Sequence, residues 1–449
     1  MKKKITEETV IFASVVKWVF LATVVGIFTG IASSGFVRLL DYSISFQTGF
    51  PYYYMFLPLI MPCVAYLSLK VFPSSLDYTT DKVISVIHGG RKISLVSIIK
   101  AFFLSIISIA SGGSAGKEAP CADIGAGFGS LFSAIFKFNT VDRKKLMICG
   151  VSAGFAGVFG VPVSGAIFGV EVLFVGSILY DVFLPSLVAG VTSYQVSSAL
   201  GAKYFVEPLN FVPHFSNLFF LKIIIAGVFF GICSFAFIEI NRFVKHISSK
   251  FSGSVIIRAF FGGIILSLIG FLISPEYLSL GINTVENSLR GCEAPFYAPI
   301  IKTITTAVTL AFGGVGGIIT PILYVGSTIG SAASSLFGIN PQTFSAIALV
   351  SLLAGITNAP IASSVMAIEI FGPEIAPYAC VSCLVSFLMT GHRSIYPSQV
   401  LSVRKSESVD VETGKTFGKI DPSCEIDQKK IQRKIKKRMK EIMHIENNK

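Results

Sequence analysis

The sequence predicts an all-α polytopic membrane protein, and three observations support this fold class. Of its 449 residues, 52% are hydrophobic and only 14% are charged, whereas average soluble domains carry about 25% charged residues. Long apolar runs recur along the chain without the alternation that barrel strands show. Two blocks of glycine and proline also repeat at a nearly constant spacing. So low a charge content excludes a cytosolic enzyme, a disordered chain and a nucleic-acid-binding module.

The net charge of +12 does not indicate a nucleic-acid partner, because its distribution is that of a membrane protein. Residues 401–449 contain 13 basic and 8 acidic residues, and the remaining excess is scattered in short polar gaps before position 401. This pattern is typical of the basic cytoplasmic loops of membrane proteins. We therefore expect a multi-pass protein of the cell membrane with both termini in the cytoplasm.

Apolar segments divide the chain into five expected parts. The run from Val10 to Ile31 predicts a first membrane helix rather than a signal peptide, because Glu7, Glu8 and Lys17 and its length do not fit a signal peptide. Several later segments are shorter than the roughly 20 residues that a span requires, which favours broken or re-entrant helices. The expected parts are a cytoplasmic N-terminus (1–14), a first membrane repeat (15–205), a loop (206–216), a second membrane repeat (217–400) and a basic cytoplasmic tail (401–449).

Within the tail, residues 429–440 predict a basic amphipathic helix. Eight of these 12 residues are basic, and Ile431, Ile435, Met439 and Ile442 recur at helical spacing. One interpretation is a solvated helix that fixes topology. The alternative is docking on anionic lipid headgroups.

An internal repeat is the strongest sign of how the membrane part is organised. One block recurs at an offset of 201 and a second at an offset of 198, in the same order. Repeats of this kind often run in opposite directions through the bilayer, with the substrate site between them near the midplane. The matches are Gly112-Gly113, Gly116, Pro120, Gly125, Gly129 and Ser130 with Gly313-Gly314, Gly317, Pro321, Gly326, Gly330 and Ser331, then Ala156-Gly157, Pro162 and Glu171 with Ala354-Gly355, Pro360 and Glu369.

The first block predicts an anion site. Lys117 and Glu118 are ionisable residues between apolar runs, where such groups by default face a polar path. Pro120 suits the first turn of a following helix, so Glu118 would lie at the positive helix N-terminus. Free amides, the helix dipole and a nearby cation favour an anion. The carboxylate could act as an internal anion that protonation releases. The alternative is that Glu118 only caps the helix while Lys117 reaches an interface.

The second block, residues 313–321, has the same glycine-then-proline pattern without a charge. It would bring a second helix N-terminus to the same site, and two positive helix ends favour an anion over a cation. We see no carboxylate cluster, and Cys380 and Cys383 form a lone C-x-x-C, so we expect neither a metal nor a cofactor. Residues 112–116 formally fit the G-x-S-x-G pattern of serine hydrolases. An intramembrane hydrolase with Ser114 as nucleophile is therefore the alternative outside the transport class.

The quoted motifs resemble those of the CLC family of chloride channels and proton-coupled chloride transporters, over about residues 15–400. Residues 116–120 are similar to its G-R/K-E-G-P motif and residues 317–321 to its G-x-F-x-P motif. Residues 165–171 resemble the segment around its internal glutamate pair, and residues 394–397 resemble the region of its pore tyrosine. The resemblance implies a CLC-type inverted repeat of broken and tilted helices, and a homodimer with one pore per subunit. Helices 162–174 and 360–371, with the runs after them, would form the dimer interface.

The resemblance also implies a role for each matched residue. Glu118 would be the gating glutamate, and the Tyr396 hydroxyl would donate to a central anion. Backbone N–H groups would line a central site at Ile318 and Ile319 and an outer site at Lys117, Glu118 and Ala119.

Three departures from the family pattern bear on selectivity and coupling. Residues 76–81 lack the glycines and serine of the family's G-S-G-x-P motif, and Tyr78 or a threonine hydroxyl would replace the serine donor. Ile319 replaces a phenylalanine, which leaves the backbone donor intact. Val172 stands where the transporters carry their internal proton-accepting glutamate. Glu171 could substitute on a proton path, although one position along a helix turns a side chain by about 100°.

We therefore expect a transport protein, not an enzyme, that moves chloride or a similar small monovalent anion through the bilayer. Its gate would be the protonation of Glu118, with anion/H⁺ antiport as a further expectation. Alternatives within the class are a passive anion channel and a carrier for fluoride or nitrate.

Overall fold

The two halves of the chain pass through the same order of helices. The computed structural model describes residues 2–47, 49–71, 80–204, 209, 216–251 and 253–420, with side chains from residue 7 onward. Tyr78 and the predicted basic helix at 429–440 lie outside these residues. The helices described in the first half are α1 (Lys2–Gln47), α2 (Leu57–Tyr66), α3 (Thr80–Gly89), α4 (Leu95–Ala110), α5 (Glu118–Ile135), α6 (Thr140–Phe159), α7 (Pro162–Glu171) and α8 (Tyr180–Ala199).

The second half repeats this order, beginning again with a long helix. Its described helices are α9 (Asn217–Lys250), α10 (Val255–Leu272), α11 (Ile282–Leu289), α12 (Ala298–Ala311), α13 (Ile319–Phe337), α14 (Pro341–Thr357), α15 (Pro360–Phe371) and α16 (Ala376–Met389). The described strands, β1 (Phe174–Val175) and β2 (Val400–Leu401), form one short parallel pair. The predicted all-α fold is confirmed.

Helix lengths fit the expectation of broken helices. Four helical stretches among the described residues are long and apolar enough to cross a membrane: 7–47, 53–71, 217–250 and 255–272. Apolar helices such as α4 and α12 have 16 and 14 residues. At 1.5 Å per residue they extend over about 24 and 21 Å, less than the roughly 30 Å of a hydrocarbon core. They end where the glycine loops begin.

The repeated glycines allow helices to pack closely in both halves. A Cβ atom added to Gly125 of α5 would overlap the carbonyl of Gly150 in α6. The matching Gly326 of α13 lies against Leu349 of α14, where an added Cβ would be 2.7 Å from its Cα. Small residues at such crossings are typical of membrane helix pairs. The repeated glycines of the sequence therefore lie in two equivalent helix pairs, α5 with α6 and α13 with α14.

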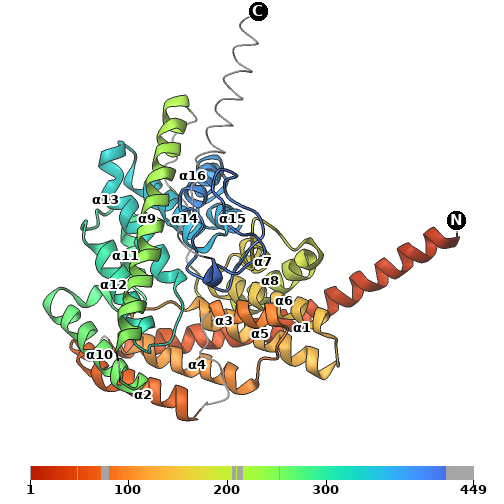
Figure 1. Cartoon of the computed structure of the whole chain (residues 1–449), viewed down its shortest axis with the longest axis horizontal. Helices are drawn as coiled ribbons and strands as arrows, with labels where there is room; N and C mark the ends of the chain where they lie inside the picture. The colour runs from red at the N-terminus through yellow and green to blue at the C-terminus, as the bar shows by residue number, and fades with distance from the viewer. Residues whose placement is uncertain are drawn as a thin grey trace, which may run out of the picture.

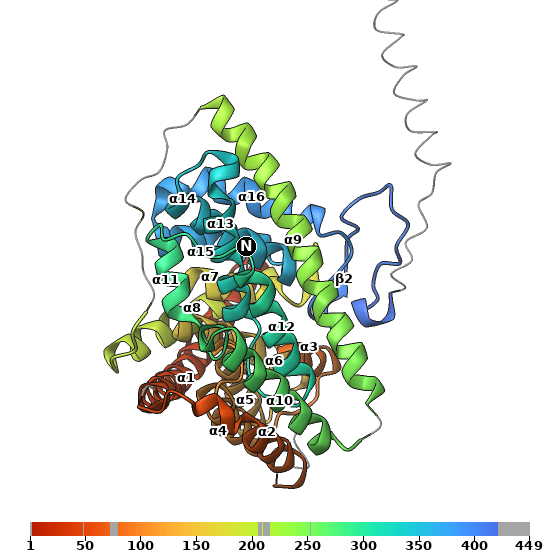
Figure 2. The same cartoon turned by 90° about the vertical axis from the view of Figure 1, so that its left-hand side faces the viewer.

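Figures 1 and 2 show how the halves are arranged. Helices α13, α14 and α16 gather toward one end of the molecule, and α2, α4 and α5 toward the other. The long helix α9 runs along the edge between these ends (Figure 2). Beside it lies the C-terminal segment, residues 390–420, which contains β2. This segment attaches to the first half because Val400 pairs with Phe174, and Leu401 with Val175.

Candidate functional site

The candidate site forms where the two glycine loops pair with each other. The N–H of Gly116 donates to the carbonyl of Gly317, and the N–H of Gly317 donates back, both at 2.7 Å. Helix α5 starts directly after the first loop at Glu118, and α13 starts after the second at Ile319. Two helix N-termini, one from each half, therefore meet at this bridge, as the sequence predicted.

The carboxylate of Glu118 occupies the N-terminus of the opposite helix. Its side chain is buried, with 1% exposed. Oε1 accepts a hydrogen bond from the Ile319 N–H at 2.6 Å, and Oε2 accepts one from the Thr320 hydroxyl at 2.8 Å. The Ile319 N–H is one of the free backbone donors of a helix start, which favour negative charge, and the Thr320 hydroxyl adds a side-chain donor. Glu118 thus serves as an internal anion from one half that is bound by the other half.

Glycine is required on both sides of this carboxylate. A Cβ atom added to Gly116 or to Gly317 would overlap the carboxylate oxygens of Glu118. The two glycines that form the bridge therefore also create the space for the side chain.

Two cavities lie on either side of Glu118. The Lys117 cavity, of about 450 Å³, is lined by Lys117, Thr320 and other residues of both halves. The Tyr396 cavity, of about 490 Å³, is lined by Ala119, residues 313–318 and Tyr396, among others. The chain neighbours of Glu118 thus line different cavities. Glu118 and the glycine bridge therefore separate two cavities. A residue that closes a permeation path would have this position.

Tyr396 lies in the wall of the second cavity. Its side chain is 3% exposed, and its hydroxyl faces the Thr80 side chain at the start of α3. The tyrosine therefore joins the C-terminal segment to the first half at the cavity wall. The Tyr396 N–H donates to the Ser394 hydroxyl at 2.9 Å, which holds the loop in its turn.

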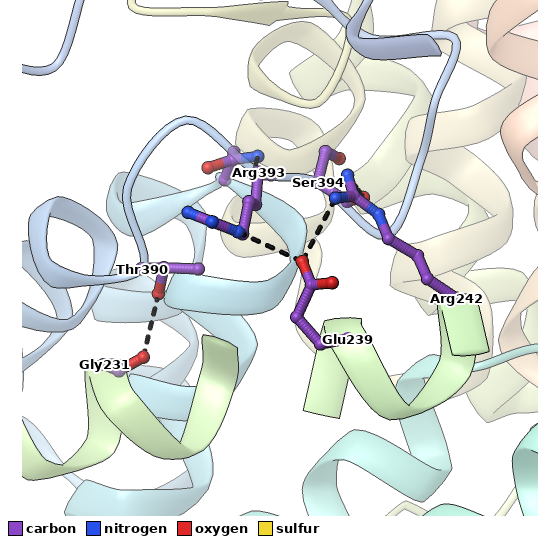
Figure 3. A network of polar contacts seen from close by, with 7 residues as sticks. Gly231, Glu239, Arg242, Thr390, Arg393 and Ser394 are labelled. Atoms are coloured by element: carbon purple, nitrogen blue, oxygen red, sulfur yellow. Dashed lines mark hydrogen bonds and ion pairs between the residues drawn. The ribbon is translucent and has the colours of Figure 1, made fainter. Parts of the chain in front are cut away.

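A polar network fixes this loop against α9 (Figure 3). Oε1 of Glu239 accepts from Arg242 Nη1 at 3.2 Å and from Arg393 Nε at 3.0 Å. The other guanidinium nitrogen of Arg242 donates to the Ser394 carbonyl at 3.5 Å. One carboxylate therefore connects the long helix to the loop that carries Tyr396.

Glu171 has a different structural role from that of Glu118. Its carboxylate accepts the N–H groups of Ile361 and Ala362, at 3.1 and 2.8 Å, at the start of α15. In the other half, Glu369 accepts the N–H groups of Val163 and Ser164, at 2.9 and 2.8 Å, at the start of α7. The matched glutamates of the sequence repeat thus cap each other's helices.

The position of Ser114 does not favour the hydrolase alternative. Ser114 follows helix α4 instead of a strand, and its hydroxyl pairs with the Thr306 hydroxyl at 2.9 Å. Its N–H donates to the Thr309 hydroxyl at 3.0 Å. Ser114 is therefore a contact between the two halves.

The structure brings together most of the predicted site residues. Glu118 contacts Ile319, while Lys117, Ala119, Ile318 and Tyr396 line the adjoining cavities. Tyr78 lies outside the described residues. The sequence analysis missed Thr320 as a hydroxyl donor, although its place in the first helical turn just before Pro321 was a usable signal.

Comparisons with known proteins agree with this geometry. A family model described as voltage gated chloride channel matches residues 60–391. The "Chloride/fluoride channel protein" of Pseudomonas syringae pv. tomato is 30% identical over 393 residues, which cover 86% of each chain. "Uncharacterized protein MJ0305" of Methanocaldococcus jannaschii is 24% identical and covers 86% of this chain and 96% of its own.

Solved structures show the same fold. The structure titled as a CLC-type fluoride/proton antiporter superposes with a TM-score of 0.81 at 26% identity, covering 86% of this chain and 98% of that one. A slow cyanobacterial Cl⁻/H⁺ antiporter superposes with a TM-score of 0.75 at 18% identity, covering 84% and 96%. The second likeness bears on the fold alone.

Proposed function

Because this chain belongs to the CLC family, whose model is described as voltage gated chloride channel, we propose that it transports a small monovalent anion across a membrane in exchange for protons. The observation that carries this proposal is the position of the Glu118 carboxylate on the Ile319 N–H and the Thr320 hydroxyl, between two cavities. An anion and this carboxylate would compete for the same donors.

The geometry suggests how the exchange would proceed. Protonation removes the charge of Glu118 and weakens its hold on the helix N-terminus, because the charged form makes the stronger hydrogen bonds. An anion that enters from either cavity would then occupy the vacated donors. Return of the carboxylate requires loss of both the proton and the anion, so the movements of the two would be coupled.

We propose that Glu118 carries the proton without help from Glu171. Both oxygens of Glu171 accept backbone N–H groups of α15, and the neighbouring Val172 is buried and apolar. This arrangement supports a structural role for Glu171. It does not support the role on a proton path that we expected from the sequence.

Fluoride is the anion that we propose as the preferred one, in place of chloride. The names of a 30%-identical relative and of a 26%-identical structure both include fluoride. The donors at Glu118 are an N–H and a hydroxyl, which suit a small anion that accepts strong hydrogen bonds. Chloride transport and passive conduction remain the alternatives that the test must separate.

The proposal is tested by flux from liposomes reconstituted with the full chain. Fluoride and chloride efflux would be followed together with proton uptake for the wild type, Glu118→Gln and a control, Glu374→Gln, whose carboxylate is exposed. We expect wild type and control to exchange fluoride for protons, and Glu118→Gln to lose the coupled proton movement. Fluoride flux without protons in the wild type would establish the passive channel. The absence of any anion flux would overturn the proposal.

We also propose the remaining expectations for this chain: a non-enzymatic homodimer in the cell membrane with cytoplasmic termini. Exposed apolar side chains on α7, α8, α15 and α16 support a dimer interface there. These side chains are Val163, Tyr180, Leu184, Ile361, Leu384 and Leu388.

A further inference from the structure

One buried carboxyl group takes no part in the gate or in helix capping. Three carboxyl side chains are buried within the described part of the chain: those of Glu118, Asp123 and Glu171. Glu118 is bound by the Ile319 N–H and the Thr320 hydroxyl, and Glu171 by two N–H groups of α15. In contrast, Oδ1 of Asp123 is buried without a hydrogen-bond partner in the described ranges. Such a group is costly, and inside a membrane it marks by default an ion or proton path.

The repeat shows that helix packing does not require a carboxyl group at this position. Asp123 of α5 corresponds to Tyr324 of α13 at the offset of 201 that relates the two glycine blocks. Tyr324 is fully buried, and the centre of its ring lies 5.0 Å from Nζ of Lys302. The second half thus fills the equivalent position with an aromatic ring. The carboxyl group belongs to the first half alone, which is also the half that carries Glu118.

Asp123 lies close to both Glu118 and the Tyr396 cavity. It follows Ala119, a residue of the cavity wall, by about one helical turn, so the two share a face of α5. Side chains of a helix lean toward its N-terminus, which brings the carboxyl group back toward that wall. Asp123 and Glu118 both interact electrostatically with Tyr396, whose hydroxyl faces Thr80. Hydroxyl groups and water both donate and accept hydrogen bonds, so the region between the two carboxyl groups is able to pass a proton.

We propose that Asp123 exchanges protons with Glu118 during transport. This inference rests on the proposed function, since it names the group that supplies the proton to the gate. The protonated carboxyl group of Asp123 releases its proton, which reaches the Glu118 carboxylate through the hydroxyls and water of the Tyr396 cavity. Glu118 becomes neutral and leaves its donors, while Asp123 holds the negative charge until it takes up the next proton from the cavity. A positioned acid of this kind typically accelerates proton transfer about 10²–10⁴-fold.

Flux from liposomes reconstituted with the full chain tests the role of Asp123. Asp123→Asn keeps the shape of the side chain but has no carboxyl proton to release. We expect this variant to lower the rate of proton uptake at least tenfold, in exchange for the anion that the wild type transports. Asp410→Asn, at a side chain that is 63% exposed, is the matched control and should keep the wild-type rate.

A second background separates proton supply from a structural role. In Glu118→Gln the gate no longer needs a proton, so anion efflux should no longer depend on Asp123. The double variant Glu118→Gln/Asp123→Asn should therefore show the same anion efflux as Glu118→Gln alone. A loss of packing at Asp123 would instead lower anion efflux in both backgrounds.

The outcomes distinguish this inference from the proposed function. If the wild type exchanges anions for protons and Asp123→Asn does so at the same rate, Asp123 is not the proton donor and this inference alone is overturned. Lower anion efflux in the double variant than in Glu118→Gln would assign Asp123 a structural role and overturn it as well. A wild type that moves no protons would overturn the proposed function, and this inference with it.

Discussion

At the scale of single residues, the space for Glu118 depends on hydrogen atoms in place of side chains at Gly116 and Gly317. We predict that Gly317→Ala expels the carboxylate from its position, because the added methyl group would overlap it. The variant should show uncoupled anion flux like that of Glu118→Gln, with at least a tenfold loss of proton movement per anion. Parallel anion and proton measurements in liposomes provide the readout.

The matched control for this substitution is Gly35→Ala in α1, where an added Cβ has nothing within 4 Å. It should keep wild-type coupling. If Gly317→Ala retained full proton coupling, the carboxylate would not depend on this space, and the role given to the glycine pair would be wrong.

Single residues also show most clearly how much of the candidate site could be predicted from the sequence. Glu118 and the two glycine loops were predicted from charge in apolar surroundings and from the repeat, because both signals can be read directly from the sequence; Ile319 was predicted from the resemblance to the family. Thr320 was not predicted to bind Glu118, since the bond joins positions 202 residues apart. The reciprocal contacts of Glu171 and Glu369 were missed for the same reason: the repeat matched the residues but did not show that each caps the other's helix.

At the scale of helices, α7 and α15 are joined by these reciprocal caps. We predict that Glu171→Gln lowers the unfolding temperature, because substitution of a cap typically costs about 0.5–2 kcal/mol. The number of protons moved per anion should stay unchanged. Glu369→Gln should behave alike, as its equivalent in the other half. A collapse of the proton-to-anion ratio in Glu171→Gln alone would instead place Glu171 on the proton path.

The C-terminal segment gives an element-scale prediction of pH dependence. Nε2 of His392 accepts the N–H of Lys405 at 3.0 Å. Burial, with the positive charges of Lys405, Arg404 and Arg393, lowers the pKa of His392 from 6.5 to about 4. The folded segment holds the neutral imidazole, so the unfolded segment binds more protons between these values. Its stability is therefore complete above pH 6.5 and is lost as the pH falls toward 4.

Hydrogen exchange of residues 400–417, expressed as protection relative to the intrinsic rate, measures this effect. Protection in the wild type should fall from pH 7 to pH 5. His392→Gln should remove that dependence, because its amide accepts a hydrogen bond without titrating. His246→Asn, at an exposed position of α9, should keep it. An unchanged pH dependence in His392→Gln would show that another group controls the segment.

At the scale of the whole molecule, composition and repeat together were sufficient to predict the all-α membrane fold class. They did not predict that the C-terminal segment returns to the first half, where Asp81 binds Ser398 and β2 pairs with β1. Two-residue strands have no periodic signal, and a hydrogen bond spanning 317 positions has no local one.

The proposed homodimer is a property of the whole molecule, and a single charged substitution in the expected interface tests it. Leu384 of α16 lies on the expected interface and is 47% exposed, and Leu268 of α10 lies elsewhere and is 50% exposed. An arginine costs a similar amount at either position if both face lipid. A dimer interface at α16 would bury the first arginine without a partner, which is far more costly. We therefore predict that Leu384→Arg yields monomers by light scattering in detergent, whereas Leu268→Arg stays dimeric. Equal behaviour of the two variants would show that α16 faces lipid and that the subunits do not associate through it.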